Sequence, residues 1–452
     1  MSDLDKIFKA YDIRGVVPDQ LDEGVAEAVG AAFVRLTGAG QLVVLHDMRA
    51  SSAPMAAAMA RGAASQGANV INGGLGSTDM AYYASGFLDV PGVMITASHN
   101  PARYNGIKLC RAGAKPVGIE TGLAELKQMM ANGVPGSGKP QGTITDKDLL
   151  PGYAAYLKKL VDLSGIRPLK VAVDAGNGMG GYTVPTVFEG LPIEVIPLYF
   201  ELDGTFPNHE ANPIDPDNLR DLQKAVVEHG ADIGLAFDGD ADRCFVVDER
   251  GEIVSPSVLT AMVAARELAR ERDATIIHNL ITSRAVPEIV TEHGGTPVRT
   301  RVGHSFIKAK MADTNAIFGG EHSGHFYFRD FWYADSGMLT ALHTLAALGG
   351  SDGTLSELLA DYSRYAQSGE INSEVADQAA TTEAVRRRYG KLPGVTFDEL
   401  DGLTVIGDTW WFNLRPSNTE PLLRLNVEAS SAEEMSALRD EVLGFVRGGA
   451  EQ

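Results

Sequence analysis

Short apolar segments recur along this chain, and each is followed by a loop rich in Gly, Ser, Asn or Asp and then by a helix-like stretch. The clearest examples are residues 41–45, 90–96, 170–174, 232–237, 274–278 and 316–318. Strands that alternate with helices predict parallel α/β units, because parallel neighbours need a crossover connection. In such units ligands bind at the loops that follow the carboxyl ends of the strands.

The length of 452 residues is too great for one ordinary core and indicates roughly three domains. The end of the chain differs in pattern: residues 404–415 and 422–429 are typical of strands joined by a turn, and a helix is expected from Ala432. We therefore expect three consecutive α/β domains with mixed or parallel sheets and a smaller C-terminal α+β domain. The expected domains are 1–148, 149–253, 254–367 and 368–452, with linkers at 133–142, 251–256 and 367–371.

Composition excludes several classes of protein. Hydrophobic residues at 44% and charged residues at 22% are ordinary for a globular chain, and a net charge of -20 argues against a nucleic-acid partner. Cys110 and Cys244 are too few for a disulfide framework or a four-cysteine metal site. The sequence shows neither a signal-like start nor an apolar run of about 18 residues. We expect a cytoplasmic protein with no membrane partner.

Residues 238–243, Asp-Gly-Asp-Ala-Asp-Arg, follow the apolar segment 233–237 and carry the strongest chemical signal in the chain. In an extended loop, side chains at alternate positions point the same way, so the three carboxylates would converge on one point. Hard oxygen ligands of this kind suit Mg²⁺ better than a soft transition metal. Arg243 beside a cation indicates that an anion such as a phosphate shares the site.

Two other interpretations of this loop compete with a magnesium site. Glu249 falls at the twelfth position from Asp238, as in a calcium-binding EF-hand, but that motif needs Gly at the sixth position, where this chain has Arg243. It also needs flanking helices, whereas residues 244–248 are typical of a strand. The simpler alternative is a solvated acidic turn, which the preceding apolar strand disfavours.

Residues 96–101, Thr-Ala-Ser-His-Asn-Pro, follow the apolar segment 90–95. A serine hydroxyl at the end of a strand can act as a nucleophile or a phosphate carrier. We do not expect His99 to activate Ser98 as in a hydrolase, because adjacent side chains in an extended chain point apart, and the Gly-x-Ser-x-Gly turn is missing. By itself, this segment is equally compatible with a plain turn.

Four motifs occur in order at domain-sized spacing. They are the serine loop 96–101, the acidic loop 238–243, Gly-Glu-His-Ser-Gly-His at 320–325 and Arg-Pro-Ser-Asn-Thr-Glu-Pro at 415–421. Together they resemble the α-D-phosphohexomutase family, in particular its bacterial phosphomannomutase/phosphoglucomutase branch. The resemblance covers nearly the whole chain from Tyr-Asp-Ile-Arg-Gly at 11–15 onward, and it implies that the four domains surround a deep central cleft.

The resemblance also assigns roles to individual residues. It implies that Ser98 carries a phosphate, and that this phosphate completes the coordination of Mg²⁺. The implied protein ligands of the metal are Asp238, Asp240 and Asp242, and the residues around the transferring phosphoryl group are Arg14, His99, Lys108 and Arg243. Such a site is physically reasonable, since phosphoryl transfer depends mostly on positioning and electrostatic stabilisation.

Two further loops are implied to hold the substrate. Glu321 and Ser323 match the sugar-recognition loop of the family, and a carboxylate and a hydroxyl on one face can bond neighbouring sugar hydroxyls. The loop that holds the non-reacting phosphate is matched by Arg415, Ser417, Asn418 and Thr419, whose forked and short donors suit a phosphate dianion. Without the resemblance, both segments would be equally typical of surface turns.

Three positions are less clearly assigned. His304 and His325 match residues that the family places in its cleft, where an imidazole could transfer a proton, but a structural role is as compatible with the sequence. The family's dual-specificity enzymes carry a phosphate-binding lysine where this chain has Ile281. That contact is lost or supplied from elsewhere, with Arg284 as one candidate, which leaves the preferred sugar in doubt.

The implied reaction interconverts hexose 1-phosphate and hexose 6-phosphate. Phosphorylated Ser98 gives its phosphate to the sugar, and the hexose 1,6-bisphosphate, also the activator, turns over within the site before the other phosphate returns to Ser98. Mobility of the last domain about 367–371 would help this turnover. We expect mannose as the preferred sugar and glucose as a second one, because His322 stands where phosphoglucosamine mutases usually have Gln. The expected partner is a phosphosugar, and the protein is expected to be a monomer or a homodimer.

Other functions compete with this one. A phosphoglucosamine mutase, a phosphatase that transfers the phosphate to water, and a non-catalytic sugar-phosphate-binding protein share parts of the pattern. Residues 176–181, Gly-Asn-Gly-Met-Gly-Gly, follow the segment 170–174 and fit a dinucleotide-binding loop, with Glu201 further on. That match is weak on its own, and Asp174 would crowd a pyrophosphate, so we expect a structural turn instead.

Overall fold

The computed structural model of the chain describes residues 4–416 and 422–448. Its elements fall into two compact units. The first unit comprises Met1–Ser255, Met311–Phe318 and Ser323–Leu358, and the second comprises Pro256–Lys310, Gly319–His322 and Leu359–Gln452. Within the described residues, every helix is too short or too polar to cross a membrane.

The first sheet of the first unit has seven strands, in the order β1-β5-β4-β2-β3-β7 with β6 beside β5. Their bounds are Ile13–Val16 for β1, Gln41–His46 for β2, Asn69–Leu75 for β3, Gly92–Ile95 for β4, Tyr104–Arg111 for β5, Lys115–Pro116 for β6 and Ile144–Asp146 for β7. Strands β2, β3, β4 and β7 are parallel, whereas β5 runs antiparallel to β1 and β4. The loops after β2 and β4 therefore start side by side at one edge of the sheet.

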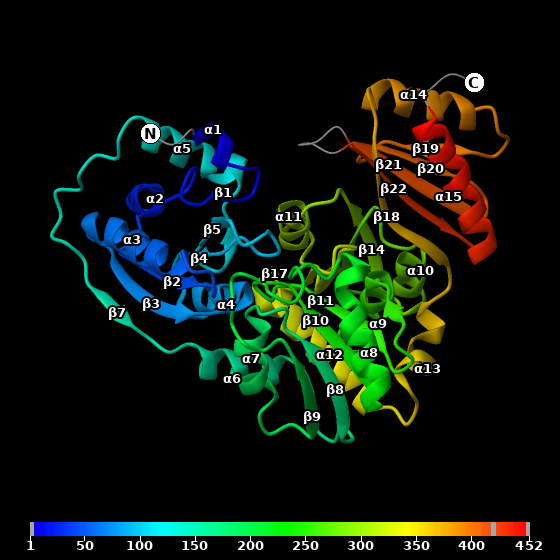
Figure 1. Ribbon diagram of the computed structural model, residues 1–452, viewed down its shortest axis with the longest axis horizontal. Coiled ribbons are helices and arrows are strands. Elements are labelled where there is room, and N and C mark those ends of the chain that lie inside the picture. The colour runs from blue at the N-terminus through cyan, green and yellow to red at the C-terminus, as the bar shows by residue number, and fades with distance from the viewer. Residues whose placement is uncertain (1–3, 417–421, 449–452) are drawn as a thin grey trace. The chain divides into compact units, whose positions relative to one another are not determined.

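Five helices accompany this sheet: α1 Leu4–Ile7, α2 Glu23–Thr37, α3 Ser52–Ser65, α4 Thr78–Leu88 and α5 Leu123–Ala131. Figure 1 shows α2 and α3 side by side against the blue strands. Helices α2 and α3 cross closely because a glycine of each helix faces the backbone of the other at the contact. A Cβ at Gly62 would lie 1.9 Å from the carbonyl oxygen of Glu27, and one at Gly30 would lie 2.2 Å from that of Met59.

The second sheet has five strands, in the order β12-β11-β10-β8-β9. They are β8 Leu169–Asp174, β9 Ile193–Leu198, β10 Ile233–Phe237, β11 Cys244–Asp248 and β12 Ile253–Val254, with helices α6 Leu150–Leu160, α7 Gly180–Phe188 and α8 Arg220–His229. Strands β8, β9 and β10 are parallel, and β11 returns antiparallel to β10, so the acidic loop 238–243 is the connection between β10 and β11. The segment 251–256, which we expected to be a linker, contains β12.

The first unit also holds the antiparallel pair β16 Phe326–Phe328 and β17 Ala334–Asp335, followed by helix α12 Gly337–Gly349. Ser336 caps α12 by accepting a hydrogen bond from the backbone N–H of Leu339. Every residue of α12 is buried, which explains why its sequence is apolar on all sides. A Cβ at Gly337 would lie 2.6 Å from the carbonyl carbon of Arg243, so the start of α12 packs directly on the acidic loop.

The second unit begins with helix α9 Pro256–Arg270, the parallel strands β13 Thr275–Asn279 and β14 Thr296–Thr300, and helix α10 Ala285–Glu292. It ends with an antiparallel sheet in the order β18-β22-β21-β20-β19, which comprises β18 Ala366–Glu374, β19 Thr396–Asp398, β20 Leu403–Ile406, β21 Trp410–Pro416 and β22 Leu422–Ala429. Helices α14 Gln378–Tyr389 and α15 Ala432–Arg447 accompany this sheet. Helices α11 His304–Thr314 and α13 Leu355–Leu359 and strand β15 Phe318–Gly320 belong partly to each unit.

Two expectations for the C-terminal part are wrong. The segment 404–415 is not one strand but two, because the chain turns between β20 and β21, where the backbone N–H of Gly407 donates to the carbonyl of Trp410. The segment 367–371 is not a linker, because it lies within β18 and pairs with β22 around an irregularity between Gln367 and Glu370. Mobility of the last domain about this segment stays a prediction.

We predict that Gly62→Ala lowers the thermal denaturation midpoint, because the added Cβ would press on the carbonyl of Glu27 and force α2 and α3 apart. The cost should match that of an overpacked core, about 1–3 kcal/mol, and calorimetry measures it. The control is Gly444→Ala in α15, where no described atom lies within 4 Å of the new Cβ; better helix propensity should stabilise this variant by up to about 1 kcal/mol. Equal midpoints for the two variants would contradict the close crossing.

Candidate active site

The serine loop after β4 and the acidic loop after β10 meet inside the first unit. Ser98 is buried, with 4% of its surface exposed, and its Oγ donates a hydrogen bond of 2.8 Å to Oδ2 of Asp238. The backbones also touch, since a Cβ at Gly239 would lie 2.4 Å from the carbonyl oxygen of Ser98. Only glycine fits this contact, and it fixes the hydroxyl of Ser98 beside the carboxylates.

Ser98 adopts a left-handed backbone conformation with φ of 51°, which a residue with a side chain rarely takes. Its N–H donates to Oγ1 of Thr96 over 2.9 Å. The expectation that Ser98 and His99 point apart assumed an extended chain and is wrong here. The bend brings Nδ1 of His99 to 3.3 Å from Oγ of Ser98. A strained backbone that re-aims a side chain is characteristic of functional loops.

The acidic loop does gather its carboxylates, although not in the way that we expected. The loop is a turn and not an extended segment: Ala241 has φ of 57°, and its N–H donates to the carbonyl of Asp238 over 3.0 Å. One oxygen from each of Asp238, Asp240 and Asp242 lies within 4.8 Å of the others, and all three residues are buried. The convergence therefore comes from the turn and not from strand periodicity.

Two cations sit directly on this acidic triad. Nζ of Lys108 lies 2.7 Å from Oδ2 of both Asp240 and Asp242, and Nε of Arg243 lies 3.0 Å from Oδ2 of Asp238. Burial is the main effect on Asp238, and with the neighbouring carboxylates it outweighs Arg243 and raises the pKa of Asp238 to about 7. Charge in this cluster is therefore poorly solvated and needs close positive partners.

The residues of the triad fit a hard divalent cation. Oδ1 of Asp240 is buried and accepts no hydrogen bond from the residues that the structure describes, which leaves a carboxylate oxygen available as a ligand. An EF-hand is excluded, because strands β10 and β11 flank the loop. The carboxylate of Glu249 accepts hydrogen bonds from the backbone N–H and the hydroxyl of Ser356 instead.

Arg14 and His99 line the same loop. Arg14 donates to Oδ1 of Asn100 and, over 2.5 Å, to Oδ2 of Asp12. Nδ1 of His99 faces a guanidinium nitrogen of Arg243 in a very short contact. Burial, together with the charges of Arg243 and Arg14, holds the pKa of His99 well below its usual range. This imidazole is therefore neutral at physiological pH and accepts at Nδ1.

His325 joins the acidic loop from the start of β16. Its Nε2 lies 3.5 Å from Oδ1 of Asp242, and its Nδ1 lies 3.1 Å from Oγ of Ser323. Burial lowers the pKa of His325, but the hydrogen bond and charge of Asp242 outweigh burial and raise it overall. Ligand atoms of His325, Asp242 and Asp335 also lie within 4.8 Å of one another. The structure thus brings His325 to the triad.

The remaining candidates belong to the second unit. Glu321 is 2% exposed, and its Oε2 accepts from Nδ2 of Asn279 over 3.4 Å, while His304 begins helix α11. A guanidinium nitrogen of Arg415 lies 3.3 Å from Oε2 of Glu370. Three expected phosphate-binding residues, Ser417, Asn418 and Thr419, lie outside the described residues.

Glu370 and Thr78 were missed by the sequence analysis. Burial alone would raise the pKa of Glu370, but His322, Arg424 and Arg415 around it lower the value to about 2, so Glu370 is an anion that orients Arg415. Thr78 donates a hydrogen bond of 2.5 Å to Oδ2 of Asp240. Neither lies in a motif, although Thr78 follows the end of β3, where ligand loops were expected.

The buried pair Asp47 and Arg49 was also missed. It follows β2, beside the serine loop, and Nη2 of Arg49 donates to the carbonyl of Ser98 over 2.8 Å. Charged residues directly after a buried strand were a signal that could have found this pair.

The position of the missing family lysine is apolar. Ile281 is buried in a cluster with Leu280 and Trp411. Arg284, which we considered as a substitute, has its Nε 3.4 Å from Oε1 of Glu428 and its guanidinium 4.8 Å from the ring centre of Tyr365. Two of its nitrogens, Nε and Nη2, are buried and have no hydrogen-bond partner among the described residues, so the role of Arg284 as the replacement phosphate contact stays a prediction.

The glycine-rich segment 176–181 supports the acidic loop. A Cβ at Gly178 would lie 2.7 Å from the carbonyl oxygen of Gly239, and the backbone N–H of Met179 donates to that carbonyl over 2.9 Å. Asp174 accepts from Nε2 of His209 over 2.9 Å. These contacts agree with the structural turn that we expected and not with a dinucleotide loop.

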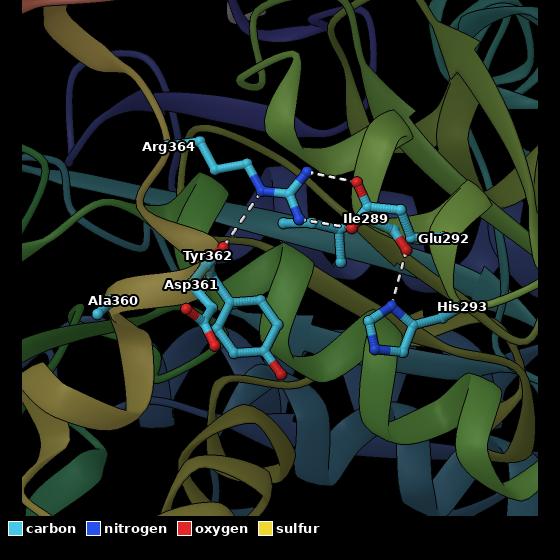
Figure 2. Close-up of a pocket in the computed structure, with 7 residues that line it drawn as sticks. All are labelled: Ile289, Glu292, His293, Ala360, Asp361, Tyr362 and Arg364. Carbon is cyan, nitrogen blue, oxygen red and sulfur yellow. Dashed lines mark hydrogen bonds and ion pairs between the residues drawn. The ribbon is translucent and has the colours of Figure 1, made fainter.

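A separate pocket of about 530 Å³ lies in the second unit between α10 and residues 360–364 (Figure 2). Figure 2 shows Arg364 pointing at Glu292, whose Oε1 lies 2.7 Å from Nη1 of Arg364. Nε of Arg364 also donates to the carbonyl of Asp361 over 3.2 Å. Because the guanidinium of Arg364 is already paired with a carboxylate, the pocket is poorly suited to binding a phosphate.

Comparison with known proteins identifies the family of this chain. Sequence models for the phosphoglucomutase/phosphomannomutase α/β/α domains I, II and III match residues 5–133, 151–251 and 257–365, and the model for the C-terminal domain matches residues 370–444. Curated relatives include a phosphohexose mutase of Xanthomonas campestris pv. campestris, 40% identical over 98% of this chain and 99% of that protein. Another is a phosphomannomutase of Escherichia coli, 38% identical over 97% and 99%.

A solved structure gives the same result. A phosphoglucomutase/phosphomannomutase family protein from Burkholderia thailandensis superimposes with a TM-score of 0.88 and 33% identity, covering 100% of this chain and 99% of the other. These findings confirm the succession of α/β domains and the phosphohexomutase class of enzyme that we expected. The chain therefore belongs to the phosphoglucomutase/phosphomannomutase family.

Proposed function

We propose that this enzyme interconverts hexose 1-phosphate and hexose 6-phosphate, with mannose preferred, by moving phosphate on and off Ser98. The observation that carries the proposal is the buried hydroxyl of Ser98, held 2.8 Å from Asp238 among three carboxylates and two cations. A hydroxyl that lies between a guanidinium and a carboxylate cluster able to bind a metal ion is well placed to carry a phosphoryl group.

The proposed ligands of Mg²⁺ are Asp238, Asp240 and Asp242, with a phosphate oxygen on Ser98 as a further ligand. Such a metal ion, when bound, supplies positive charge that stabilises the transferring phosphoryl group. The available oxygen of Asp240 and the hard donor set support this assignment.

The protein's own side chains have distinct roles in this proposal. Arg243, 3.3 Å from Oγ of Ser98, and Lys108 are positioned to neutralise phosphoryl oxygens, while Arg14 holds the serine loop through Asn100. Neutral His99 accepts a hydrogen bond from Arg243 at Nδ1, and this nitrogen lies 3.3 Å from Oγ of Ser98. His325, whose pKa is raised, is a candidate to hold a proton for the sugar hydroxyl.

Recognition of the sugar is proposed for Glu321 and Ser323, and recognition of the non-reacting phosphate for Arg415 with the loop that follows it. The names of the relatives, phosphomannomutase and phosphohexose mutase, support mannose as the preferred sugar. We further propose a hexose 1,6-bisphosphate as intermediate and activator. The domain bounds 1–148, 149–253, 254–367 and 368–452, a role for His304, the cytoplasmic location and the state of monomer or homodimer stay predictions.

We predict that the purified protein, primed with glucose 1,6-bisphosphate and supplied with Mg²⁺, converts mannose 1-phosphate with a higher kcat/KM than glucose 1-phosphate or glucosamine 1-phosphate. Ser98→Ala should be inactive, because it removes the oxygen that carries the phosphate. Coupled assays of the three sugars measure both.

Each outcome of this assay bears on a different part of the proposal. A preference for glucosamine 1-phosphate would contradict only the choice of sugar. Activity of Ser98→Ala equal to that of the wild type would contradict the phosphoserine route. Release of inorganic phosphate without isomerisation would indicate a phosphatase.

Replacement of one acidic ligand tests the metal site. We predict that Asp240→Asn weakens Mg²⁺ binding about 100-fold or more, as measured by isothermal titration calorimetry, because an amide oxygen carries no charge for a hard cation. Asp221→Asn, on the outer helix α8, is the control and should leave the affinity unchanged. Unaltered Mg²⁺ affinity in Asp240→Asn would place the metal elsewhere.

The proposed phosphate-binding role of Arg415 can be tested by kinetics. Arg415→Lys should raise the KM for mannose 1-phosphate about 10-fold, because a lysine loses the forked hydrogen bonds to phosphate. The control is Arg447→Lys in α15, whose Nε donates to Ser373 over 3.0 Å; its KM should stay that of the wild type. If both variants keep the wild-type KM, Arg415 does not bind the substrate phosphate.

A further inference from the structure

Arg49 is a buried arginine that is bonded almost entirely to the serine loop. Its side chain is 1% exposed. Nη1 donates to the carbonyls of Pro101 over 3.0 Å and Tyr104 over 2.9 Å. Nη2 donates to the carbonyls of Ser98 over 2.8 Å and Asn100 over 2.7 Å. One guanidinium thus binds the carbonyl of Ser98, two later carbonyls of the serine loop and the carbonyl of the first residue of β5.

The fifth donor of Arg49 is also used, and this fixes the guanidinium itself. Nε donates to Oδ2 of Asp47 over 3.2 Å, and the backbone N–H of Arg49 donates to Oδ1 of the same carboxylate over 3.0 Å. Oδ1 also accepts from the hydroxyl of Ser52. Asp47 and Arg49 follow β2, a central strand of the sheet, so the guanidinium is anchored to a rigid element.

The serine loop needs such an anchor because of its own backbone. Ser98 is held at φ of 51°, and a left-handed residue with a side chain persists only where its surroundings over-determine it. The carbonyl of Ser98 must also lie within touching distance of Gly239. Among the described residues, the hydroxyl of Thr96 accepts from the N–H of Ser98, and the guanidinium of Arg49 donates to its carbonyl.

We infer that Arg49 is a positioning residue for phosphoryl transfer: by binding three carbonyls of the serine loop and one at the start of β5, it holds the hydroxyl of Ser98 beside Asp238, although its side chain makes no bond to that hydroxyl. The inference rests on the proposed role of Ser98 as phosphate carrier. A lysine cannot replace it, because a single ammonium has three donors that diverge from one nitrogen, whereas the planar guanidinium offers five in a fixed fork.

The test is Arg49→Lys in the full-length protein, which keeps the charge beside Asp47 but loses the fork. We expect kcat to fall about 100-fold, as for a misplaced reacting group, while the KM for mannose 1-phosphate stays within about threefold because the substrate loops are untouched. Phosphorylation of Ser98 by glucose 1,6-bisphosphate, followed by intact-protein mass spectrometry, should slow in parallel. Thermal denaturation confirms that the variant is folded.

The control is Val29→Ala, which removes buried methyl groups from the core of the same domain without touching the serine loop. Val29→Ala should lower the denaturation midpoint and leave kcat unchanged. That result would show that a loss of stability alone does not lower kcat in Arg49→Lys. If Arg49→Lys does not fold, the Asp47→Asn variant tests the positioning role of Arg49 instead. This variant loosens the guanidinium and should lower kcat about 10-fold at unchanged KM.

The outcomes separate this inference from the proposed function. If the wild type takes up phosphate on Ser98, but folded Arg49→Lys is phosphorylated as fast and keeps kcat within twofold, the inference is wrong and the proposed function stands. The same holds if Asp47→Asn keeps wild-type kcat when Arg49→Lys is unfolded. If the wild type takes up no phosphate on Ser98, the proposed function fails and the inference fails with it.

Discussion

The contact between the carbonyl of Ser98 and the backbone of Gly239 is the constraint on which the rest of this site depends. It joins the loop after β4 to the loop after β10, two segments that lie 141 positions apart in the sequence. Because Gly239 has no Cβ, the two backbones can approach closely enough for the hydroxyl of Ser98 to donate a hydrogen bond to the carboxylate of Asp238. The left-handed conformations of Ser98 and Ala241 are the local distortions that this approach requires.

Bringing the loops together has an electrostatic cost. The triad places three carboxylates in a buried site, where two cationic side chains, Lys108 and Arg243, offset only part of the negative charge. Unpaired buried charge is strongly unfavourable, so the cluster favours a bound cation. Charged groups that are satisfied only when ligands are present are a common sign of a binding site.

Much of this architecture was predictable from local patterns, because buried parallel strands are apolar runs and their following loops carry the chemistry. Strands β2, β8, β10 and β22 lie where the apolar segments placed them. The failures have physical causes. The turn at Gly407 interrupts an otherwise continuous apolar pattern, and the polar segment 367–371 becomes a strand through pairing with β22. The bend at Ser98, the ring of partners around Glu370 and the four bonds of Arg49 depend on residues distant in sequence, which no local pattern shows.

The stacking of Gly178 on Gly239, and of Gly239 on Ser98, has a consequence for how this sequence can vary. In each contact the space of a side chain is already filled by another segment's backbone, which cannot give way as a flexible side chain would. These glycines bear no reactive group and bind nothing, yet the smallest possible enlargement at either would separate the reacting loops. We therefore expect Gly178 and Gly239 to tolerate no larger side chain, although neither carries a reactive group, and changes in substrate choice to arise in loops elsewhere in the chain.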